Sequence, residues 1–246
     1  MSENSVIFGA TSTLAVSIAK RLAERHDHLF LIARSQPRLN ALKDDLMARG
    51  AASVSLLTAD FSKLDTIDPV CQSVIAKANV IHKVFVCHGV LGNQELAQQD
   101  ITTAFHDLDV NFSSYVAILT PIANQMETDG VGTIIVISSV AGDRGRQSNY
   151  IYGTAKAATT AFTSGLRNRL HRSNVSVLTV KPGFMDTAMT QHLKKNPLFI
   201  SADRAAEIIL KALDSRKNIV YVPRFWQLIM LLIKAIPETL FKRLKL

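Results

Sequence analysis

Three residues in the middle of the chain have the types and spacing of an acid–base site. Ser139 ends an apolar run, and Tyr152 and Lys156 follow it on a stretch with helical spacing. Residues four apart lie on one face of a helix, so the Lys156 ammonium is expected to lower the pKa of the Tyr152 phenol from its ordinary value of about 10. The Ser139 hydroxyl can hydrogen-bond a carbonyl oxygen. Together they predict proton transfer to or from a carbonyl or alcohol oxygen.

A second candidate site lies near the start of the chain, where the apolar run Val6–Gly9 leads directly into a helical pattern. Such a turn presents backbone N–H groups and the positive end of a helix dipole to a pyrophosphate. Gly9 is its only glycine, because Thr13 and Ala15 stand where a glycine-rich loop has its second and third. The alternative is a tight turn that binds no ligand. The expected cofactor contacts are Gly9, Thr11, Ser12, Thr13 and Leu14.

Arg34 ends the next apolar run, near where an adenosine ribose would lie. An acidic residue there binds the 2′-hydroxyl of NAD, whereas an arginine pairs with the 2′-phosphate of NADP, so NADP(H) is favoured over NAD(H). Asp60 follows the third run and is expected, with its neighbour Phe61, to contact the adenine. The alternatives are an exposed arginine at a strand end and an aspartate that initiates a turn.

The elements that must position these residues alternate along the whole chain. Continuous β-branched and aliphatic runs, typical of strands covered on both faces, occupy Val6–Gly9, His28–Ala33, Val54–Thr58, Val84–Cys87, Thr133–Ser138, Val175–Val180 and Ile219–Val222. Apolar residues at helical spacing occupy Leu14–Glu24, Leu39–Arg49, Asp68–Ala78, Ile101–Met126, Tyr150–His171 and Ala202–Ser215. This alternation predicts an α/β fold with a doubly wound, parallel seven-stranded sheet and helices on both faces.

With these motifs in place, the chain resembles the short-chain dehydrogenase/reductase family in its single-domain form, over nearly its whole length. The resemblance rests on Ser139, Tyr-x-x-x-Lys at 152–156, the N-terminal turn, Asn111 in Asp-Val-Asn-Phe, and Pro-Gly-x-x-x-Thr at 182–187. It implies a Rossmann fold and reversible hydride transfer between a nicotinamide and a small-molecule carbonyl or alcohol. The residues that it makes catalytic are Ser139, Tyr152, Lys156 and Asn111.

The resemblance also assigns finer roles. It implies that Tyr152 exchanges a proton with the substrate, that Lys156 holds the nicotinamide ribose, and that Asn111 anchors a water that resupplies protons. Both Tyr152 and Lys156 therefore count as cofactor contacts as well. The segment Pro182, Gly183 and Thr187 is expected to lie against the nicotinamide.

Two departures from the family pattern bear on function. The reduced glycine turn puts conventional cofactor affinity in question and motivates an alternative, a catalytically inactive NADP-binding sensor or scaffold, against which the intact catalytic residues argue. In addition, Val-Cys-His-Gly at 86–89 replaces the usual Asn-Asn-Ala-Gly, so its structural hydrogen bonds must come from elsewhere. His88 and Gly89 are expected to lie beside the cofactor, and an acid–base role for His88 is the less favoured alternative.

Length and composition describe one globular unit. The chain has 246 residues, of which 48 % are hydrophobic and 20 % charged, and no linker divides it. We distinguish a catalytic body, 1–222, from an apolar and basic C-terminal segment, 223–246, of the same domain. The two cysteines, Cys71 and Cys87, allow no disulfide framework and predict no metal site. They favour a reducing compartment, and since no secretory signal pattern is present the cytoplasm is expected.

The net charge of +8 is unevenly placed. Residues 215–246 hold seven basic side chains against Glu238 alone, which places six of the eight net charges there. No aromatic platform accompanies them, so no nucleic-acid partner is expected. The neighbouring apolar stretch Phe225–Ile236 is too short to cross a bilayer, which needs about 20 residues. Two alternatives follow: the segment lies on anionic lipid at the inner face of a membrane, or it lies in a homodimer or homotetramer interface.

Basic residues also surround the expected substrate site. The loop Ala141–Asn149 holds Arg144 and Arg146, and Lys194 and Lys195 follow the later Pro-Gly motif. Arginines there suit an anionic substrate, and the alternative is a solvated surface. Within the family, the stretches 9–12, 141–156 and 221–226 are similar to reductases that act on a polyprenyl-phosphate-linked keto-pentose. That resemblance implies a keto-sugar or lipid-linked sugar, which offers both an anion and an apolar tail.

Overall fold

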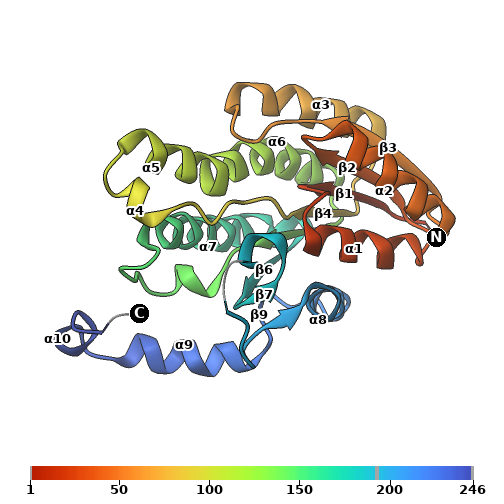
Figure 1. The fold of residues 1–246 in the computed structure, drawn as a ribbon. Coiled ribbons are helices and arrows are strands. Elements are labelled where there is room, and N and C mark those ends of the chain that lie inside the picture. Colours follow the sequence, from red (N-terminus) through yellow and green to blue (C-terminus); the bar gives the residue numbers. More distant parts are fainter. Residues whose placement is uncertain (1, 192–193, 245–246) are drawn as a thin grey trace.

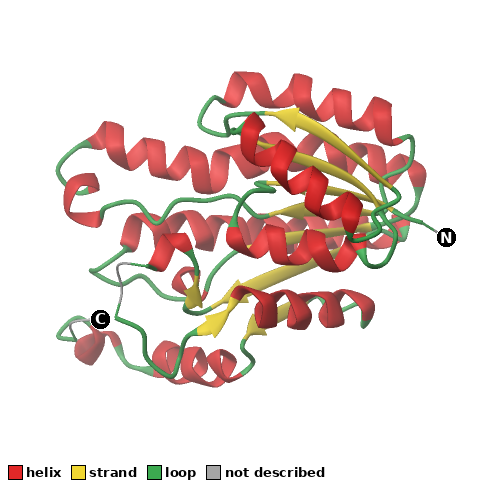
Figure 2. Cartoon of the chain, turned by 45° about the vertical axis from the view of Figure 1, so that its right-hand side comes forward, coloured by secondary structure: helices red, strands yellow, loops and turns green. Residues whose placement is uncertain are grey.

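The computed structural model describes residues 2–191 and 194–244 of the chain. Seven parallel strands form one sheet in the order β3-β2-β1-β4-β5-β6-β9, with helices layered on both faces (Figures 1 and 2). These strands are β1 Asn4–Phe8, β2 His28–Ala33, β3 Ser53–Thr58, β4 Lys83–Val86, β5 Thr133–Ile137, β6 Ser176–Pro182 and β9 Ile219–Val222. Every predicted strand is present, so the prediction of a doubly wound parallel sheet is confirmed.

The two faces of the sheet are covered by different helices. Successive strand residues point to opposite faces, so Ile7 and Leu31 enter one core while Val6 and Phe8 enter the other. The helices α1 Thr13–Ala23, α2 Gln36–Ala48 and α8 Ala202–Asp214 pack on the first face. On the second face lie α3 Ile67–Ala78, α6 Ser114–Asp129 and α7 Tyr150–Leu170.

The long helix predicted over Ile101–Met126 is divided into three parts. It consists of α5 Ile101–Leu108, a π-helical turn over Asp109–Ser113, and α6. A π-helical turn inserts one residue into the helical ladder and is frequent at functional sites. Asn111 lies at the centre of this turn and is fully buried.

Three short elements were not predicted. They are α4 Gln94–Ala97 and the two-residue strands β7 Met185–Asp186 and β8 Ile200–Ser201, which pair with each other. Two residues carry no periodic signal, so only their surroundings define these strands.

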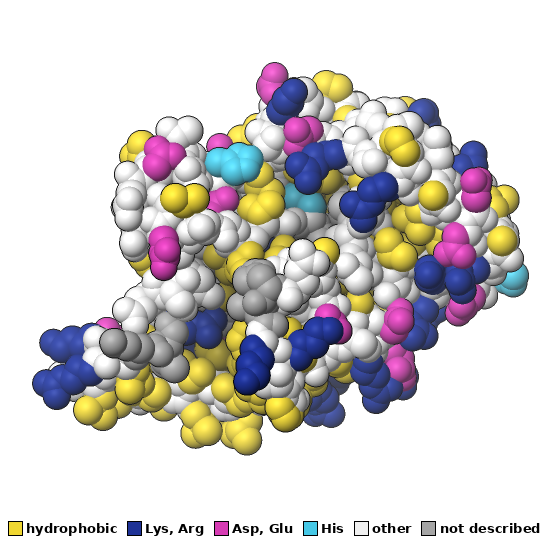
Figure 3. Space-filling model, in the orientation of Figure 1, with side chains coloured by type: hydrophobic (Ala, Val, Ile, Leu, Met, Phe, Trp, Pro, Cys, Tyr) yellow, Lys and Arg dark blue, Asp and Glu magenta, His cyan; other side chains and the backbone are white. Residues whose placement is uncertain are grey.

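The C-terminal segment lies outside the sheet, along the lower edge of Figure 1. It contains α9 Phe225–Ala235 and the short α10 Glu238–Phe241. The inner side of α9 packs Trp226 and Met230 against Val140, while leucines on its outer side remain exposed (Figure 3). Within residues 2–191 and 194–244, no helix combines the length and apolarity that a membrane crossing requires.

The strand order reverses between β1 and β4, because the chain first builds outward to β3 and then returns to the other side of β1. In sheets of this kind, ligands bind in the crevice beyond the carboxyl ends of the strands at such a switch point. Five strands bring predicted site residues to this edge. Gly9 and Arg34 directly follow β1 and β2, His88 and Ser139 lie two residues after β4 and β5, and Pro182 ends β6. The fold therefore gathers them from distant parts of the sequence.

Candidate active site

The turn between β1 and α1 needs only one glycine. Gly9 has φ +78°, and a Cβ there would lie 2.5 Å from the backbone nitrogen of His88, so glycine is required on both counts. Thr13 is already the first residue of α1 and lies outside the left-handed region. Ser12 caps the helix, its hydroxyl accepting a hydrogen bond from the Ala15 N–H at 3.3 Å. The missing glycines therefore cause no backbone strain, and the helix N-terminus remains available to a pyrophosphate.

An open pocket of about 310 Å³ lies where the adenosine is expected. Two of the expected cofactor contacts, Arg34 and Asp60, line it, together with Lys63, which sequence reasoning missed. Asp60 also initiates a turn, which was the alternative interpretation of this residue. Its carboxylate accepts hydrogen bonds from the Ser62 N–H and hydroxyl at 3.1 and 2.9 Å. Burial acts to raise the pKa of Asp60, but these bonds and the charge of Arg34 lower it overall.

A third cation lies beside the same end of the turn. The Arg38 guanidinium donates to the Thr11 carbonyl oxygen at 2.7 Å. Sequence reasoning missed Arg38. Its position four residues after Arg34, at the start of α2, could have identified it as a candidate cofactor contact. Arg34, Arg38 and Lys63 are all exposed side chains. The glycine cradle, the capped helix and these cations fit a dinucleotide that carries an additional phosphate.

Lys156 lies deep in the molecule on α7. Its ammonium donates to the Ile137 carbonyl oxygen at 3.1 Å and to the Tyr115 hydroxyl at 3.2 Å, and it lies 5.7 Å from the centre of the Tyr152 ring. Burial lowers the pKa of Lys156 to about 7. Tyr115 was missed by sequence reasoning, although it lies only four residues after Asn111. It donates its own proton to the His88 carbonyl oxygen at 2.5 Å, so it holds Lys156 as an acceptor.

Tyr152 differs from expectation in its protonation. Burial raises the pKa of Tyr152, and a hydrogen bond with Ser139 only partly opposes this. The expected lowering of the Tyr152 pKa by Lys156 is not found, because the partial burial of the phenol outweighs the other influences on it. Tyr152 therefore keeps its proton at neutral pH, which is the state that a proton donor requires.

Tight packing brings Ser139 to Tyr152. Ser139 is the cap of a single turn, Val140–Gly142, and its hydroxyl accepts from the Ala141 N–H at 3.1 Å. At Gly142 a Cβ would lie 2.6 Å from the backbone of α7, so the turn rests directly on the helix that carries Tyr152. The preceding Ser138 reinforces the contact by donating to the Lys156 carbonyl oxygen at 2.9 Å.

The Asn111 side chain connects the π-helical turn to the loop after β4. Its amide nitrogen donates to the carbonyl oxygens of Val90 and Asp107 at 2.9 and 2.8 Å, and its oxygen accepts from the Val90 N–H at 3.1 Å. Gly89 lies so close that a Cβ there would be 2.8 Å from this oxygen and 3.7 Å from the Lys156 nitrogen. Gly89 therefore lies close to both Asn111 and Lys156.

The His88 side chain is buried and makes one hydrogen bond. Its Nε2 lies 2.7 Å from the Ser114 oxygen. Because the Ser114 hydroxyl donates its only proton to the Val110 carbonyl oxygen, His88 must be the donor. Burial and the Lys156 charge lower the pKa of His88 well below its usual value, so the ring is neutral. Its Nδ1 is then a bare acceptor without a partner among the described residues, which fits a structural position and argues against an acid–base role.

The expected nicotinamide segment lies next to Ser139. The Pro182 carbonyl oxygen is 3.5 Å from the Ser139 hydroxyl, at the end of β6. Gly183 lies against Trp226 of α9, so closely that a Cβ there would overlap the indole ring. Thr187 precedes the turn Ala188–Thr190 and caps it. Among the described residues, its side chain makes no other contact that indicates a function.

Comparisons with known proteins decide the family. The model of the short chain dehydrogenase family matches residues 3–198. Over 239 residues the chain is 33 % identical to an uncharacterized oxidoreductase of Mycobacterium tuberculosis, covering 97 % of this chain and 96 % of the relative. The chain belongs to the short-chain dehydrogenase family. It is therefore an NAD(P)-dependent oxidoreductase.

Solved structures agree with this short-chain dehydrogenase in fold. A short-chain dehydrogenase from Sphingobium yanoikuyae in complex with NADPH has a TM-score of 0.83 at 23 % identity, covering 96 % of this chain and 97 % of that one. An NAD⁺-bound xylitol dehydrogenase has a TM-score of 0.79 at 19 % identity, covering 88 % and 95 %. The two neighbours carry different dinucleotides, so the fold leaves the choice between NADP and NAD to the residues at the adenosine pocket.

The two loop arginines of this short-chain dehydrogenase have different surroundings. Arg144 donates to the Ile233 and Ile236 carbonyl oxygens at 2.6 Å each and to Glu238 at 2.9 Å, and it lies 3.6 Å above the Phe241 ring. The Arg144 guanidinium therefore binds the C-terminal segment to the loop Ala141–Asn149.

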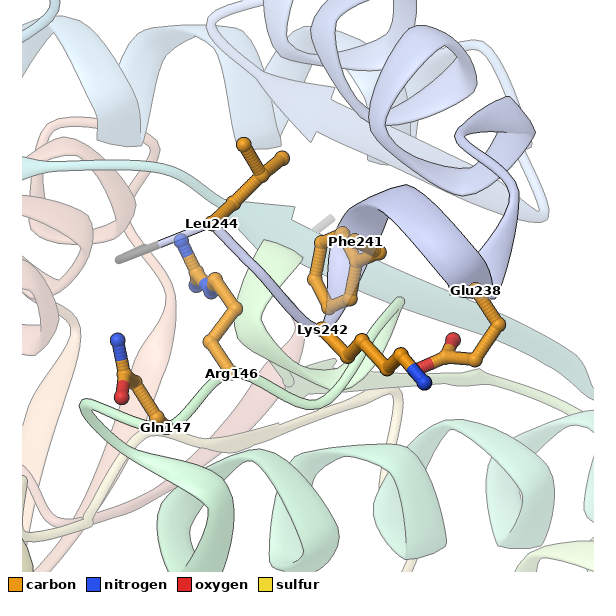
Figure 4. A pocket seen from close by; sticks show the side chains of 6 residues that line it. All are labelled: Arg146, Gln147, Glu238, Phe241, Lys242 and Leu244. Carbon is orange, nitrogen blue, oxygen red and sulfur yellow. The ribbon is translucent and has the colours of Figure 1, made fainter.

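Arg146 instead points into a small cavity between its loop and that segment (Figure 4). The cavity is lined by Arg146, Gln147, Glu238, Phe241, Lys242 and Leu244. The Arg146 Nε is buried without a partner among the described residues. Lys195, expected near the substrate, is paired with Asp186 at 2.6 Å. Arg146 therefore differs from Arg144 and Lys195, whose charged groups are paired with carboxylates.

Proposed function

We propose that this short-chain dehydrogenase reduces a small-molecule carbonyl with Tyr152 as the proton donor. The observation that carries the proposal is the grouping of the buried Ser139 and Lys156 with the half-buried Tyr152, whose phenol keeps its proton because its surroundings raise its pKa. When bound, the nicotinamide supplies the hydride, and in the reverse direction accepts it. As the new C–H bond forms, the Tyr152 O–H protonates the developing alkoxide, and the Ser139 hydroxyl donates to the same oxygen.

Lys156 and Asn111 support this proton transfer. The Lys156 ammonium, held by Tyr115 and Ile137, is proposed to bind the ribose hydroxyls and to stabilise the phenolate that remains on Tyr152. Asn111 is proposed to anchor the water that returns a proton from solvent. The catalytic body 1–222 thus carries the chemistry, with no metal ion required by the proposed steps.

NADP(H) is the proposed cofactor. The support is the cluster of Arg34, Arg38 and Lys63 around the turn and the adenosine pocket, where no acidic residue occupies the position after β2. A guanidinium binds a phosphate through two charge-assisted hydrogen bonds, which favours a 2′-phosphate over a hydroxyl. The remaining proposed contacts are Gly9, Thr11, Ser12, Thr13, Leu14, Asp60, Phe61, His88, Gly89, Pro182, Gly183 and Thr187.

The proposed substrate is a keto-sugar, free or lipid-linked, with an anionic group. Its support is Arg146, whose buried Nε has no partner among residues 2–191 and 194–244, beside the apolar side chains Phe241 and Leu244. We place the enzyme in the cytoplasm, because both cysteines are free and buried. A homodimer or homotetramer is proposed from the family resemblance alone. The reduced glycine turn was the reason for considering an inactive sensor. Because this turn is unstrained, it no longer supports that alternative.

The test is Tyr152→Phe, with Tyr150→Phe as the matched control on the exposed side of the same helix turn. NADPH oxidation is followed against a panel of ketoses, sugar phosphates and diketones, and NADPH binding is measured by fluorescence. We expect Tyr152→Phe to lose about 10³-fold or more in turnover, with NADPH affinity nearly unchanged, and Tyr150→Phe to retain activity. Near-normal turnover of Tyr152→Phe would refute the assignment.

A further inference from the structure

The outer face of α9 exposes more apolar surface than a solvated helix does. Leu228, Leu231 and Leu232 are 61, 64 and 63 % exposed, and Phe225 at the start of the helix is 42 % exposed. We call these four side chains the α9 ridge. The opposite face of the same helix is already buried through Trp226 and Met230. A helix that is apolar all round is normally covered on all sides, so the ridge requires an apolar partner.

Cations surround the ridge. Arg224 precedes it, Lys234 lies at its end, and Lys242 and Arg243 follow α10, all four being exposed. Figure 3 shows apolar side chains along the lower edge of the molecule and basic side chains gathered at the lower left, where Figure 1 places α9 and α10. Among the described residues of this segment, Glu238 is the only carboxylate, and Arg144 pairs with it at 2.9 Å. The surface therefore combines exposed leucines with an excess of positive charge.

We propose that the α9 ridge docks this enzyme onto an anionic lipid bilayer, with α9 lying in the plane of the interface. Leucines enter the acyl boundary while the neighbouring Lys and Arg side chains reach the lipid phosphates, which is the arrangement of an interfacial helix. The eleven residues of α9 span only about 16 Å, so the helix lies on the bilayer and does not cross it.

A second copy of the chain fits this surface less well. In a two-fold symmetric contact the same patch meets itself, so the cations around the ridge of one copy would come close to cations of the other. Like charges brought together in this way oppose association. Anionic lipid offers the opposite charge at the same depth as an apolar layer, so it satisfies both components of the surface.

The ridge is held as a preformed surface next to the catalytic loop. Arg144 binds the Ile233 and Ile236 carbonyl oxygens at the end of α9 and stacks on Phe241 of α10. Arg144 belongs to the loop between Ser139 and Tyr152, so a docked bilayer lies beside the entrance to the site. The proposal does not depend on the proposed reaction, because lipid binding is measured without turnover.

The experiment is co-sedimentation of the full chain with vesicles. One set contains phosphatidylcholine only, and the other contains one-third phosphatidylglycerol. The test variant combines Leu228→Ser, Leu231→Ser and Leu232→Ser, and the matched control combines Leu96→Ser and Ile101→Ser, which remove exposed apolar side chains from α4 and α5. We expect the parent and the control to bind the anionic vesicles, and the triple variant to bind at least about tenfold more weakly.

The same vesicle assay and the same variants also test the role of the positive charges and of self-association. Lys242→Glu with Arg243→Glu, or added salt, is expected to abolish the preference for anionic vesicles. NADPH titration of every variant checks that the body is folded. Equal pelleting of the parent and the triple variant would overturn the proposal. It would also be overturned if the parent bound no vesicles and analytical ultracentrifugation showed that the triple variant dissociates an oligomer, since the ridge would then belong to a second copy.

Discussion

The two ends of the site are built differently. At the adenosine end, Arg34 and Lys63 are exposed around an open pocket. At the nicotinamide end, Ser139, Lys156 and Asn111 are 9, 3 and 0 % exposed, and each is held by hydrogen bonds to the backbone. An exposed cation can be replaced with little effect on the fold, and its charge determines which ligand binds. A buried group instead affects the pKa values of the side chains beside it. The difference suggests that cofactor choice and catalysis can be changed independently.

The nicotinamide end should give the largest effect. Replacing Lys156 with Met removes the only ammonium near Tyr152 among the described residues while leaving a side chain of similar length. Turnover is expected to fall about 10³-fold, because the phenolate left after proton transfer loses its stabilising charge. Single-turnover NADPH oxidation measures this loss. Turnover within a few-fold of the parent would show that Lys156 is structural and would remove the contrast between the two ends.

The adenosine end should change affinity and leave turnover alone. Arg34→Asp is expected to weaken NADPH binding about 100-fold and to improve NADH binding, because a carboxylate repels the 2′-phosphate and accepts a bond from the 2′-hydroxyl. Turnover at saturating NADPH should stay near that of the parent. Fluorescence titration with both dinucleotides measures the switch.

Arg25→Ala is the matched control for this experiment, since Arg25 is a surface arginine paired with Asp214. It should bind both dinucleotides as the parent does. If Arg34→Asp affected NADPH and NADH equally, the adenosine pocket would not select the phosphate, and the proposal of NADP(H) would fail.

Most of the frame could be predicted from the sequence, because each buried strand is a continuous apolar run. The seven runs were all strands, and their carboxyl ends bring Gly9, His88 and Ser139 to one edge. The π-helical turn around Asn111 could not be predicted, since one inserted residue barely changes a helical pattern. The wrong expectation for the Tyr152 pKa has a similar origin. Burial is a property of the assembled core, whereas spacing along a helix shows only the neighbouring charge.

The loop arginines show the same limit. Two arginines two residues apart look equivalent in the sequence, yet Arg144 binds carbonyl groups 89 and 92 residues further along the chain. Arg146 instead faces the cavity shown in Figure 4. Only the return of the C-terminal segment to this loop separates their roles. The sequence nevertheless marked that segment correctly as apolar and basic.

The smallest expected effect is on how the free energy of unfolding changes with pH. It depends on the burial of Lys156 at the nicotinamide end. The pKa of Lys156 is about 7 in the folded protein, below its ordinary value of 10.5. Between these values the unfolded chain binds one more proton than the folded protein, so the free energy of unfolding of the parent rises with pH. Below pH 7 both states carry the proton, and the cost of burying the ammonium is constant.

Lys156→Met lacks this proton, so it isolates the effect from all other titrations. Urea unfolding of both proteins without cofactor is measured from pH 6 to pH 9. The stability advantage of Lys156→Met over the parent should be largest at pH 6 and shrink by about 1 kcal/mol per pH unit above pH 7. A difference that stays flat over this range would mean that Lys156 is well solvated, and the nicotinamide end would then resemble the open adenosine end.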